Sequence, residues 1–155
     1  MKVEEAAIAY ISRQSLKKVA FEKESKVVRL YQWSTYDKIH LIRDGISKEE
    51  LESFKKTAEL DYDTLAGILN VARATLLNKK GKTKFDATTS EKIFQLADLY
   101  SFGNAVFEST EKFNRWMKTE NRALSGVKPL SLLDTHYGVE EVRHLIGRIE
   151  YGVYS

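Results

Sequence analysis

Residues 61–80, which read DYDTLAGILNVARATLLNKK, decide the fold of this chain. Asp61 can accept a hydrogen bond from the first turn that follows it, which predicts a helix over residues 62–69. Residues 70 and 71 then form a tight turn, and a second short helix is expected from Arg73 to about Lys80. Two short helices on either side of a tight turn predict a helix-turn-helix unit.

The second of these helices carries the side chains that we expect to meet DNA. In such a unit it lies in the major groove, and its N-terminal half meets the base edges. Because Arg can bind guanine and Asn can bind adenine through paired hydrogen bonds, the predicted base-reading residues are Arg73, Thr75 and Asn78. The cations that we expect to contact phosphates are Lys79, Lys80, Lys82 and Lys84.

The distribution of charge supports this interpretation better than the total does. The formal net charge is only +3, yet residues 73–84 hold five cations and no acidic residue. A basic stripe of this kind can face phosphate even on a nearly neutral chain. A solvated, lysine-rich loop is the alternative interpretation of the same stretch.

Capping signals and apolar spacing predict further helices around this unit. Ser47 and Glu50 form a capping box, and the apolar stripe behind it consists of Leu51, Phe54, Ala58 and Leu60. A second box of Thr88 and Glu91 predicts a helix that ends at Gly103. Helices are also expected over residues 4–14, 35–44 and from about 110 onward, whereas residues 26–33 are β-prone and favour a strand.

The last third of the chain combines an apolar seam with a polar and aromatic end. Gly138 is expected to break the chain, so that the final helix follows it with a seam of Val139, Val142, Ile146, Ile149 and Val153. Tyr and Arg are typical anchors of protein interfaces, and the candidate partner-binding residues are Arg148, Glu150, Tyr151, Gly152 and Tyr154. The alternative is that Tyr151 and Tyr154 fold back onto the protein's own core.

Composition excludes several classes of protein. The 155 residues include no Cys, which removes disulfides, thiolate metal sites and cysteine nucleophiles. No apolar run approaches the roughly 20 residues of a membrane span, and residues 1–10 do not resemble a signal peptide. Hydrophobic residues at 43% and a single Pro favour a soluble, cytoplasmic, all-α protein.

An enzyme is not expected, since the sequence shows no nucleophile elbow and its glycines are too scattered for a phosphate-binding loop. His136, Glu140 and His144 are spaced by four, but a break at Gly138 would place His136 outside the final helix. We therefore predict no catalytic residue, no metal site and no cofactor.

Several segments together resemble the Xre-type antitoxins of the Xre/MbcA/ParS group, which are partners of RES-domain toxins. The resemblance covers roughly residue 36 to the C-terminus and ends in the motif GRIEYG at residues 147–152. The other matching positions are residues 65–71, Ala74, Thr75, Leu76, Trp116, Asn121, Leu124, Pro129, Leu130 and Gly138. Two positions depart from the family pattern, because Asn78 stands where Arg is common and Ala72 stands where a capping Ser is usual.

The resemblance implies an antitoxin of a type II toxin–antitoxin system. Such proteins are homodimers that neutralise a NAD-degrading toxin by covering its active-site entrance with their C-terminal region. They also repress their own operon by binding operator DNA. NAD would then be the substrate of the toxin, with no small-molecule substrate for this chain. A stand-alone helix-turn-helix regulator without a toxin partner remains the alternative.

These inferences predict three parts in one chain. Residues 1–46 form an N-terminal extension that could serve dimerisation. Residues 47–103 form an Xre-like helix-turn-helix DNA-binding domain. This domain is continuous with a C-terminal helical toxin-binding domain over residues 104–155.

Overall fold

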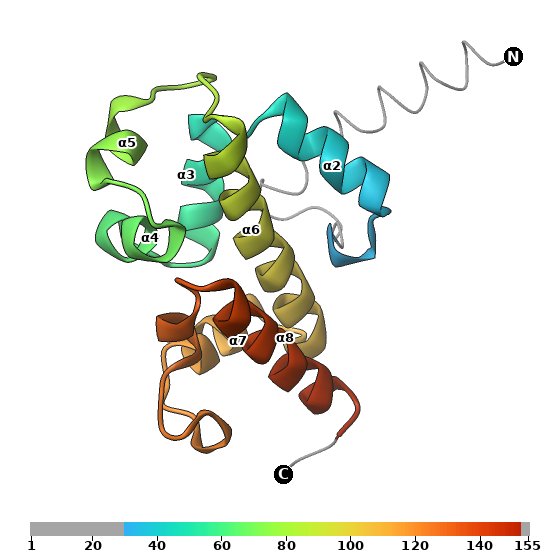
Figure 1. Cartoon of the computed structure of the whole chain (residues 1–155). Helices are drawn as coiled ribbons and strands as arrows, with labels where there is room; N and C mark the ends of the chain where they lie inside the picture. The colour runs from blue at the N-terminus through green and yellow to red at the C-terminus, as the bar shows by residue number, and fades with distance from the viewer. Residues whose placement is uncertain (1–29, 153–155) are drawn as a thin grey trace, which may run out of the picture.

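The computed structural model describes residues 30–152, and the regular elements in that part of the chain are helices joined by loops (Figure 1). Within it there are no β-strands, so the predicted all-α class is confirmed. The α-helices are α2 (Thr35–Asp44), α3 (Lys48–Thr57), α4 (Tyr62–Leu69), α5 (Arg73–Asn78), α6 (Ala87–Phe107), α7 (Thr110–Met117) and α8 (His136–Glu150). The 3-10 helices are η1 (Leu30–Gln32), η2 (Arg122–Leu124) and η3 (Pro129–Leu132).

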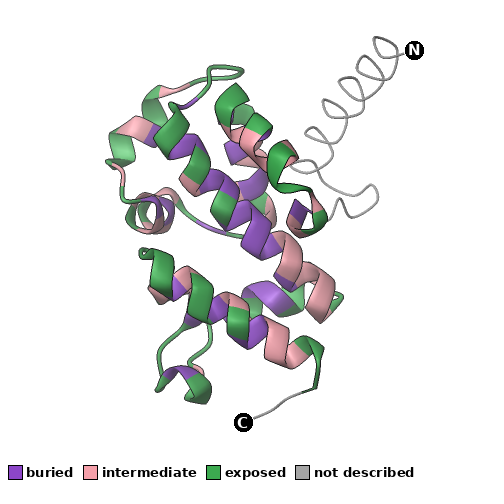
Figure 2. Cartoon of the chain, turned by 45° about the vertical axis from the view of Figure 1, so that its right-hand side comes forward, coloured by how far each residue is buried: buried purple, intermediate pink, exposed green. Residues whose placement is uncertain are grey.

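Helix α6 is the centre of the molecule. It runs for 21 residues and contacts η1, α2, α4, α7 and α8. Figure 1 shows α2 to α5 gathered around its first half, with α7 and α8 against its second half. Buried positions follow α6 along most of its length in Figure 2. The helix-turn-helix and the C-terminal region therefore share one core.

A buried carboxylate joins three helices of this core. Asp98 of α6 accepts a hydrogen bond from Lys38 Nζ of α2 at 3.2 Å and another from Arg143 Nη2 of α8 at 2.5 Å. A buried charge is costly unless it is paired, and both oxygens of Asp98 have a cationic partner. This cluster fixes α2 and α8 on the same helix, although they belong to different functional parts.

Most predicted helix starts are confirmed by their hydrogen bonds. Ser47 and Glu50 form the reciprocal capping box of α3, and the Asp61 side chain accepts from the Thr64 N–H at the start of α4. That N–H and the Thr64 side chain lower the pKa of Asp61, so the cap stays ionised to a lower pH than a free aspartate does. Pro129 stands at the first position of η3, as predicted.

The start and the end of α6 differ from the prediction. Asp86 caps this helix by accepting from the Thr89 N–H at 2.8 Å, so the capping box predicted for Thr88 and Glu91 is wrong. The helix also continues past Gly103 to Phe107. A Cβ at position 103 would overlap the ring of Phe113 on α7, so this glycine serves close helix packing and does not end the helix.

Gly138 likewise lies inside α8 and does not break the chain before it. Thr135 caps the helix by accepting from the Gly138 N–H at 3.0 Å, and His136 is the first helical residue. A Cβ at position 138 would overlap the carbonyl oxygen of Leu132 in η3. The missing side chain thus lets η3 pack directly on the first turn of α8.

Two N-terminal predictions have different outcomes. The strand expected over residues 26–33 is wrong in its described part, because residues 30–32 form η1. Leu30 is buried there, and its N–H donates to Ser101 Oγ at 3.0 Å. The helix predicted over residues 4–14 lies outside the described residues, as does Val153 of the apolar seam.

Two glycines of α8 provide a matched test of the close packing. We expect Gly138→Ala to lower the free energy of unfolding by about 1–3 kcal/mol or more, because the new methyl group overlaps backbone atoms. Gly147→Ala adds the same group in the same helix where nothing lies within 4 Å, and we expect it to raise stability by about 0.5–1 kcal/mol. Chemical denaturation measures both, and equal effects of the two variants would contradict the packing described for Gly138.

Candidate functional site

The outward face of α5 is a mixture of polar and apolar side chains. Arg73 and Asn78 are exposed, as predicted, whereas Thr75 is only half-buried at the edge of this face. Ala74 and Leu77 are also exposed, although neither is among the predicted base-reading residues. Leu76 is fully buried and fixes which side of α5 faces the core.

The first residue of this face is held by the preceding helix. Arg73 Nε lies 3.0 Å from Asp63 Oδ1 of α4, and both side chains are largely exposed. An exposed ion pair of this kind contributes little stability, but it restricts the directions in which the guanidinium can point. The two helices of the motif are thus connected on the solvent side as well as through the core.

The predicted phosphate-binding cations lie on α5's C-terminal side, in the segment that leads to α6. Lys80 and Lys82 are exposed, and Lys79 is half-buried with its Nζ 5.9 Å from the centre of the Phe85 ring. Lys84 Nζ binds the carbonyl oxygen of Asp44 at 2.7 Å and its carboxylate at 2.8 Å. Lys84 therefore already has an anionic partner within the chain.

This lysine-rich segment is anchored to the start of α3. The N–H groups of Lys48 and Glu49 donate to the carbonyl oxygens of Thr83 and Gly81, each at 3.0 Å. The N–H of Phe85 donates to the carbonyl oxygen of Ile46 at 2.8 Å. The cations are consequently presented by a segment with regular backbone hydrogen bonds.

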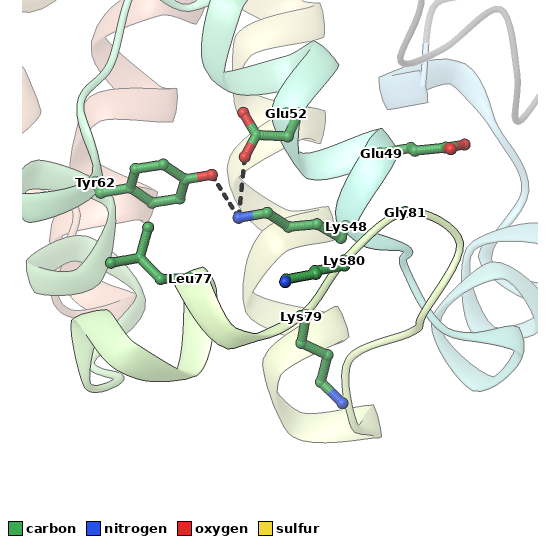
Figure 3. A pocket seen from close by; sticks show the side chains of 8 residues that line it. All are labelled: Lys48, Glu49, Glu52, Tyr62, Leu77, Lys79, Lys80 and Gly81. Atoms are coloured by element: carbon green, nitrogen blue, oxygen red, sulfur yellow. Dashed lines mark hydrogen bonds and ion pairs between the residues drawn. The ribbon is translucent and has the colours of Figure 1, made fainter.

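A buried lysine, Lys48, holds the C-terminal part of α5 in place. Figure 3 shows Lys48 of α3 pointing toward Tyr62 and Glu52; its Nζ donates to the Tyr62 hydroxyl and lies 2.9 Å from Glu52 Oε1. The same Nζ donates to the carbonyl oxygen of Leu76 at 2.6 Å. Because Ala72 gives α5 no side-chain cap, this bond is a main support of a helix of only six residues.

An open pocket of about 470 Å³ lies between α3 and the end of α5 (Figure 3). It is lined by Lys48, Glu49, Glu52, Tyr62, Leu77, Lys79, Lys80 and Gly81. The ammonium group of Lys48 has three acceptors there, so its role is to hold α3, α4 and α5 together. Leu77 forms an apolar part of the rim beside Lys79 and Lys80.

The C-terminal site residues divide between the core side of α8 and its exposed end. Val142 and Ile146 are fully buried against the core. Arg148 is half-buried, with Nη2 4.0 Å from Glu141 Oε1. Glu150, Tyr151 and Gly152 are exposed, and Tyr151 is 81% exposed, so the alternative in which Tyr151 folds back onto the core is wrong. Tyr154 lies outside the described residues.

The turn of the helix-turn-helix touches the segment that leads into α8. Asn70, the left-handed residue that ends α4, donates from Nδ2 to the carbonyl oxygen of Asp134 at 2.7 Å. A cavity of about 160 Å³ lies beside this bond, between α4, α6 and the start of α8. The helix-turn-helix and the segment that leads into α8 are therefore in direct contact.

The helical position of His136 changes the geometry predicted for the histidines. His136 and Glu140 lie on α8 with 3.5 Å between Nε2 and Oε1, and His144 follows one turn later. No group of three or more metal-binding side chains is arranged to hold an ion among residues 30–152. In the same range, no helix is long and apolar enough to cross a membrane.

Two family models match consecutive parts of the chain. The antitoxin Xre-like helix-turn-helix domain matches residues 37–98, from α2 into α6. The antitoxin Xre/MbcA/ParS C-terminal toxin-binding domain matches residues 103–152, which include the end of α6, α7 and α8. The order of the two domains is the order expected from the sequence.

Two curated relatives of similar sequence are also named as antitoxins. A "Prs ADP-ribosylating antitoxin" of Sphingobium sp. (strain YBL2) is 29% identical over 137 residues, which cover 81% of this chain and 86% of the relative. An "Antitoxin Xre" of Photorhabdus laumondii is 29% identical over 130 residues, which cover 83% of this chain and 72% of the relative.

A solved structure has a similar fold. A chain of the crystal structure of the M. tuberculosis MbcT-MbcA toxin-antitoxin complex aligns with a TM-score of 0.51 at 18% identity, over 68% of this chain and 94% of that chain. At this identity the likeness concerns the fold alone. One matched domain covers the helix-turn-helix and the other covers α8. Together they show that the chain belongs to the Xre/MbcA/ParS antitoxins of toxin–antitoxin systems.

Proposed function

We propose that this antitoxin neutralises a RES-type toxin that degrades NAD, by covering the entrance of the toxin's active site with its C-terminal end. The observation that carries the proposal is the exposed end of α8, where Glu150, Tyr151 and Gly152 project from a helix whose other side is buried. Tyr and Arg side chains are frequent anchors of interfaces, and Arg148 and Tyr151 are adjacent to this end. Tyr154 lies outside the described residues and belongs to this proposal by its place in the sequence alone.

The name of one relative supports the proposal that the toxin uses NAD. ADP-ribosyl groups are transferred from NAD, and one relative is named for ADP-ribosylation. A partner that consumes NAD would fit this antitoxin, which itself would need no cofactor. With this function, we expect the chain to act in the cytoplasm, where the toxin's proposed substrate is found.

We also propose that the chain binds operator DNA as a homodimer and represses its own operon. The proposed base-reading residues are Arg73, Thr75 and Asn78, and the proposed phosphate contacts are Lys79, Lys80, Lys82 and Lys84. Exposed positions on α5 and the exposed Lys80 and Lys82 support this assignment. A helix-turn-helix dimer binds two half-sites, which is why we expect a homodimer on a symmetric operator.

The toxin-binding end can be tested by deleting residues 151–155. These residues follow the last residue of α8, so we expect the shortened protein to keep its melting temperature. On co-expression with the RES-type protein encoded beside it, we expect the shortened chain to lose neutralisation, seen as growth arrest and NAD depletion.

A point variant sharpens this test. We expect Tyr151→Ser to weaken toxin binding by at least about tenfold, the loss typical of an interface anchor. Tyr36→Ser is the matched control, because Tyr36 is 78% exposed on α2 and lies outside the matched toxin-binding domain.

Full neutralisation by the shortened chain would show that the end of α8 is not the toxin-binding element. A genome without an adjacent RES-type reading frame would favour the stand-alone regulator.

The DNA-binding face can be tested by reversing two charges. We expect Lys79→Glu with Lys80→Glu to abolish a gel shift on the upstream operon DNA, because two phosphate contacts per chain become repulsive. The toxin complex should form as before. Lys112→Glu with Lys128→Glu makes the same change of charge at exposed positions near α7 and η3, and it should leave the gel shift intact. An unchanged shift with the first pair would rule out this face.

A further inference from the structure

We propose that α5 recognises the 5-methyl groups of thymine through Ala74 and Leu77, which makes these two residues determinants of operator sequence. The inference deepens the DNA-binding function proposed above and rests on it. It starts from an unusual placement, because the middle of the exposed face of this helix is apolar.

The order of side chains across α5 follows from helix geometry. Each residue advances by about 100° around the axis. Across the outward face the order is therefore Arg73, Leu77, Ala74 and Asn78, and Leu76 lies on the opposite, buried side. Two apolar side chains stand between a guanidinium and a carboxamide.

The chain cannot bury Leu77 by rotating α5. Leu76 is fully buried, and its carbonyl oxygen accepts a hydrogen bond from Lys48 Nζ at 2.6 Å. Rotation would break this bond and expose Leu76. Leu77 is therefore held at 38% exposure on the rim of the pocket beside α3.

The surroundings of Leu77 match the chemistry of a DNA major groove. Lys79 and Lys80 line the same pocket as Leu77 (Figure 3). Glu49 and Glu52 line it too, and Glu52 is paired with Lys48. In the major groove the thymine methyl group is the apolar feature of the base edges, and the phosphates run along both sides. An apolar helix face followed directly by Lys79 and Lys80 is complementary to that pattern.

The polar flanks complete the proposed reading. Arg73, held by Asp63 at 3.0 Å, can bind guanine, and Asn78 can bind adenine. Between these contacts the apolar pair favours thymine over cytosine, which has no methyl group. We therefore expect each half-site to contain a thymine whose methyl group faces the middle of α5.

The experiment removes the methyl group from the DNA and leaves base pairing unchanged. The full-length protein, alone and with its toxin, is bound to the upstream operon DNA, and footprinting locates the protected bases. Each protected thymine is then replaced singly by deoxyuridine. We expect the affinity to fall about fourfold at each contacted position, the effect of losing one buried methyl group.

A protein variant assigns the effect to a residue. In Leu77→Ala we expect one of the sensitive thymines to become insensitive to replacement by deoxyuridine. Val127→Ala is the matched control, because Val127 is 39% exposed in the C-terminal part, and it should keep the full pattern of sensitivity.

The outcomes separate this inference from the function on which it rests. If the protein binds the DNA but tolerates every deoxyuridine, the methyl contacts are absent, and DNA binding itself still stands. If neither the protein nor its toxin complex binds the DNA, both proposals fail. If Leu77→Ala keeps every deoxyuridine effect but changes the oligomeric state in sedimentation, Leu77 is a contact between copies of the chain, which overturns its proposed role.

Discussion

The buried carboxylate of Asp98 is the interaction on which the arrangement of the whole chain depends. It lies on the central helix and binds Lys38 of α2 on one side and Arg143 of α8 on the other. Removal of one partner would be destabilising, because a charge in a largely buried position would lose its counter-ion. The two ion pairs of Asp98 therefore hold the helix-turn-helix part and the C-terminal part in one orientation. The hydrogen bond from Asn70 to Asp134 adds a second contact between these parts.

This arrangement explains how one small body can offer two separate surfaces. Helix α5 depends on Lys48, which reaches its buried side and leaves the outward face free for a ligand. Helix α8 uses Val142 and Ile146 for the core and leaves its end, with Tyr151, exposed. Since the two proposed surfaces lie on different helices, the proposed DNA partner and the toxin would not compete for the same side chains.

Local signals in the sequence predicted the fold well. The capping residues Ser47 and Asp61 act within one turn of the residues they bind, so their effect can be read from spacing alone. Gly103 and Gly138 could not be interpreted in this way. Each is required by a contact with a distant segment, Phe113 in one case and Leu132 in the other, and a glycine inside a helix carries no local sign of such packing.

The candidate surfaces were only partly predictable for a similar reason. Leu76 and Leu77 are adjacent in a six-residue helix, and the sequence offers too short a pattern to tell which of them faces the core. In the structure Leu76 faces the core, and the hydrogen bond from Lys48 of α3 to the carbonyl oxygen of Leu76 holds α5 in this orientation. Tyr151 is the reverse case: the sequence offered both an exposed interface residue and one folded back onto the core, and the end of α8 at Glu150 leaves it exposed.

The central claim is that DNA and toxin occupy separate surfaces of one chain. Hydrogen–deuterium exchange of the full-length protein, measured alone, with operator DNA and with toxin, tests this claim most directly. We expect DNA to slow exchange in residues 73–84 and toxin to slow exchange in residues 145–152, each with little effect on the other segment. Protection of residues 73–84 by the toxin, or of residues 145–152 by DNA alone, would contradict it.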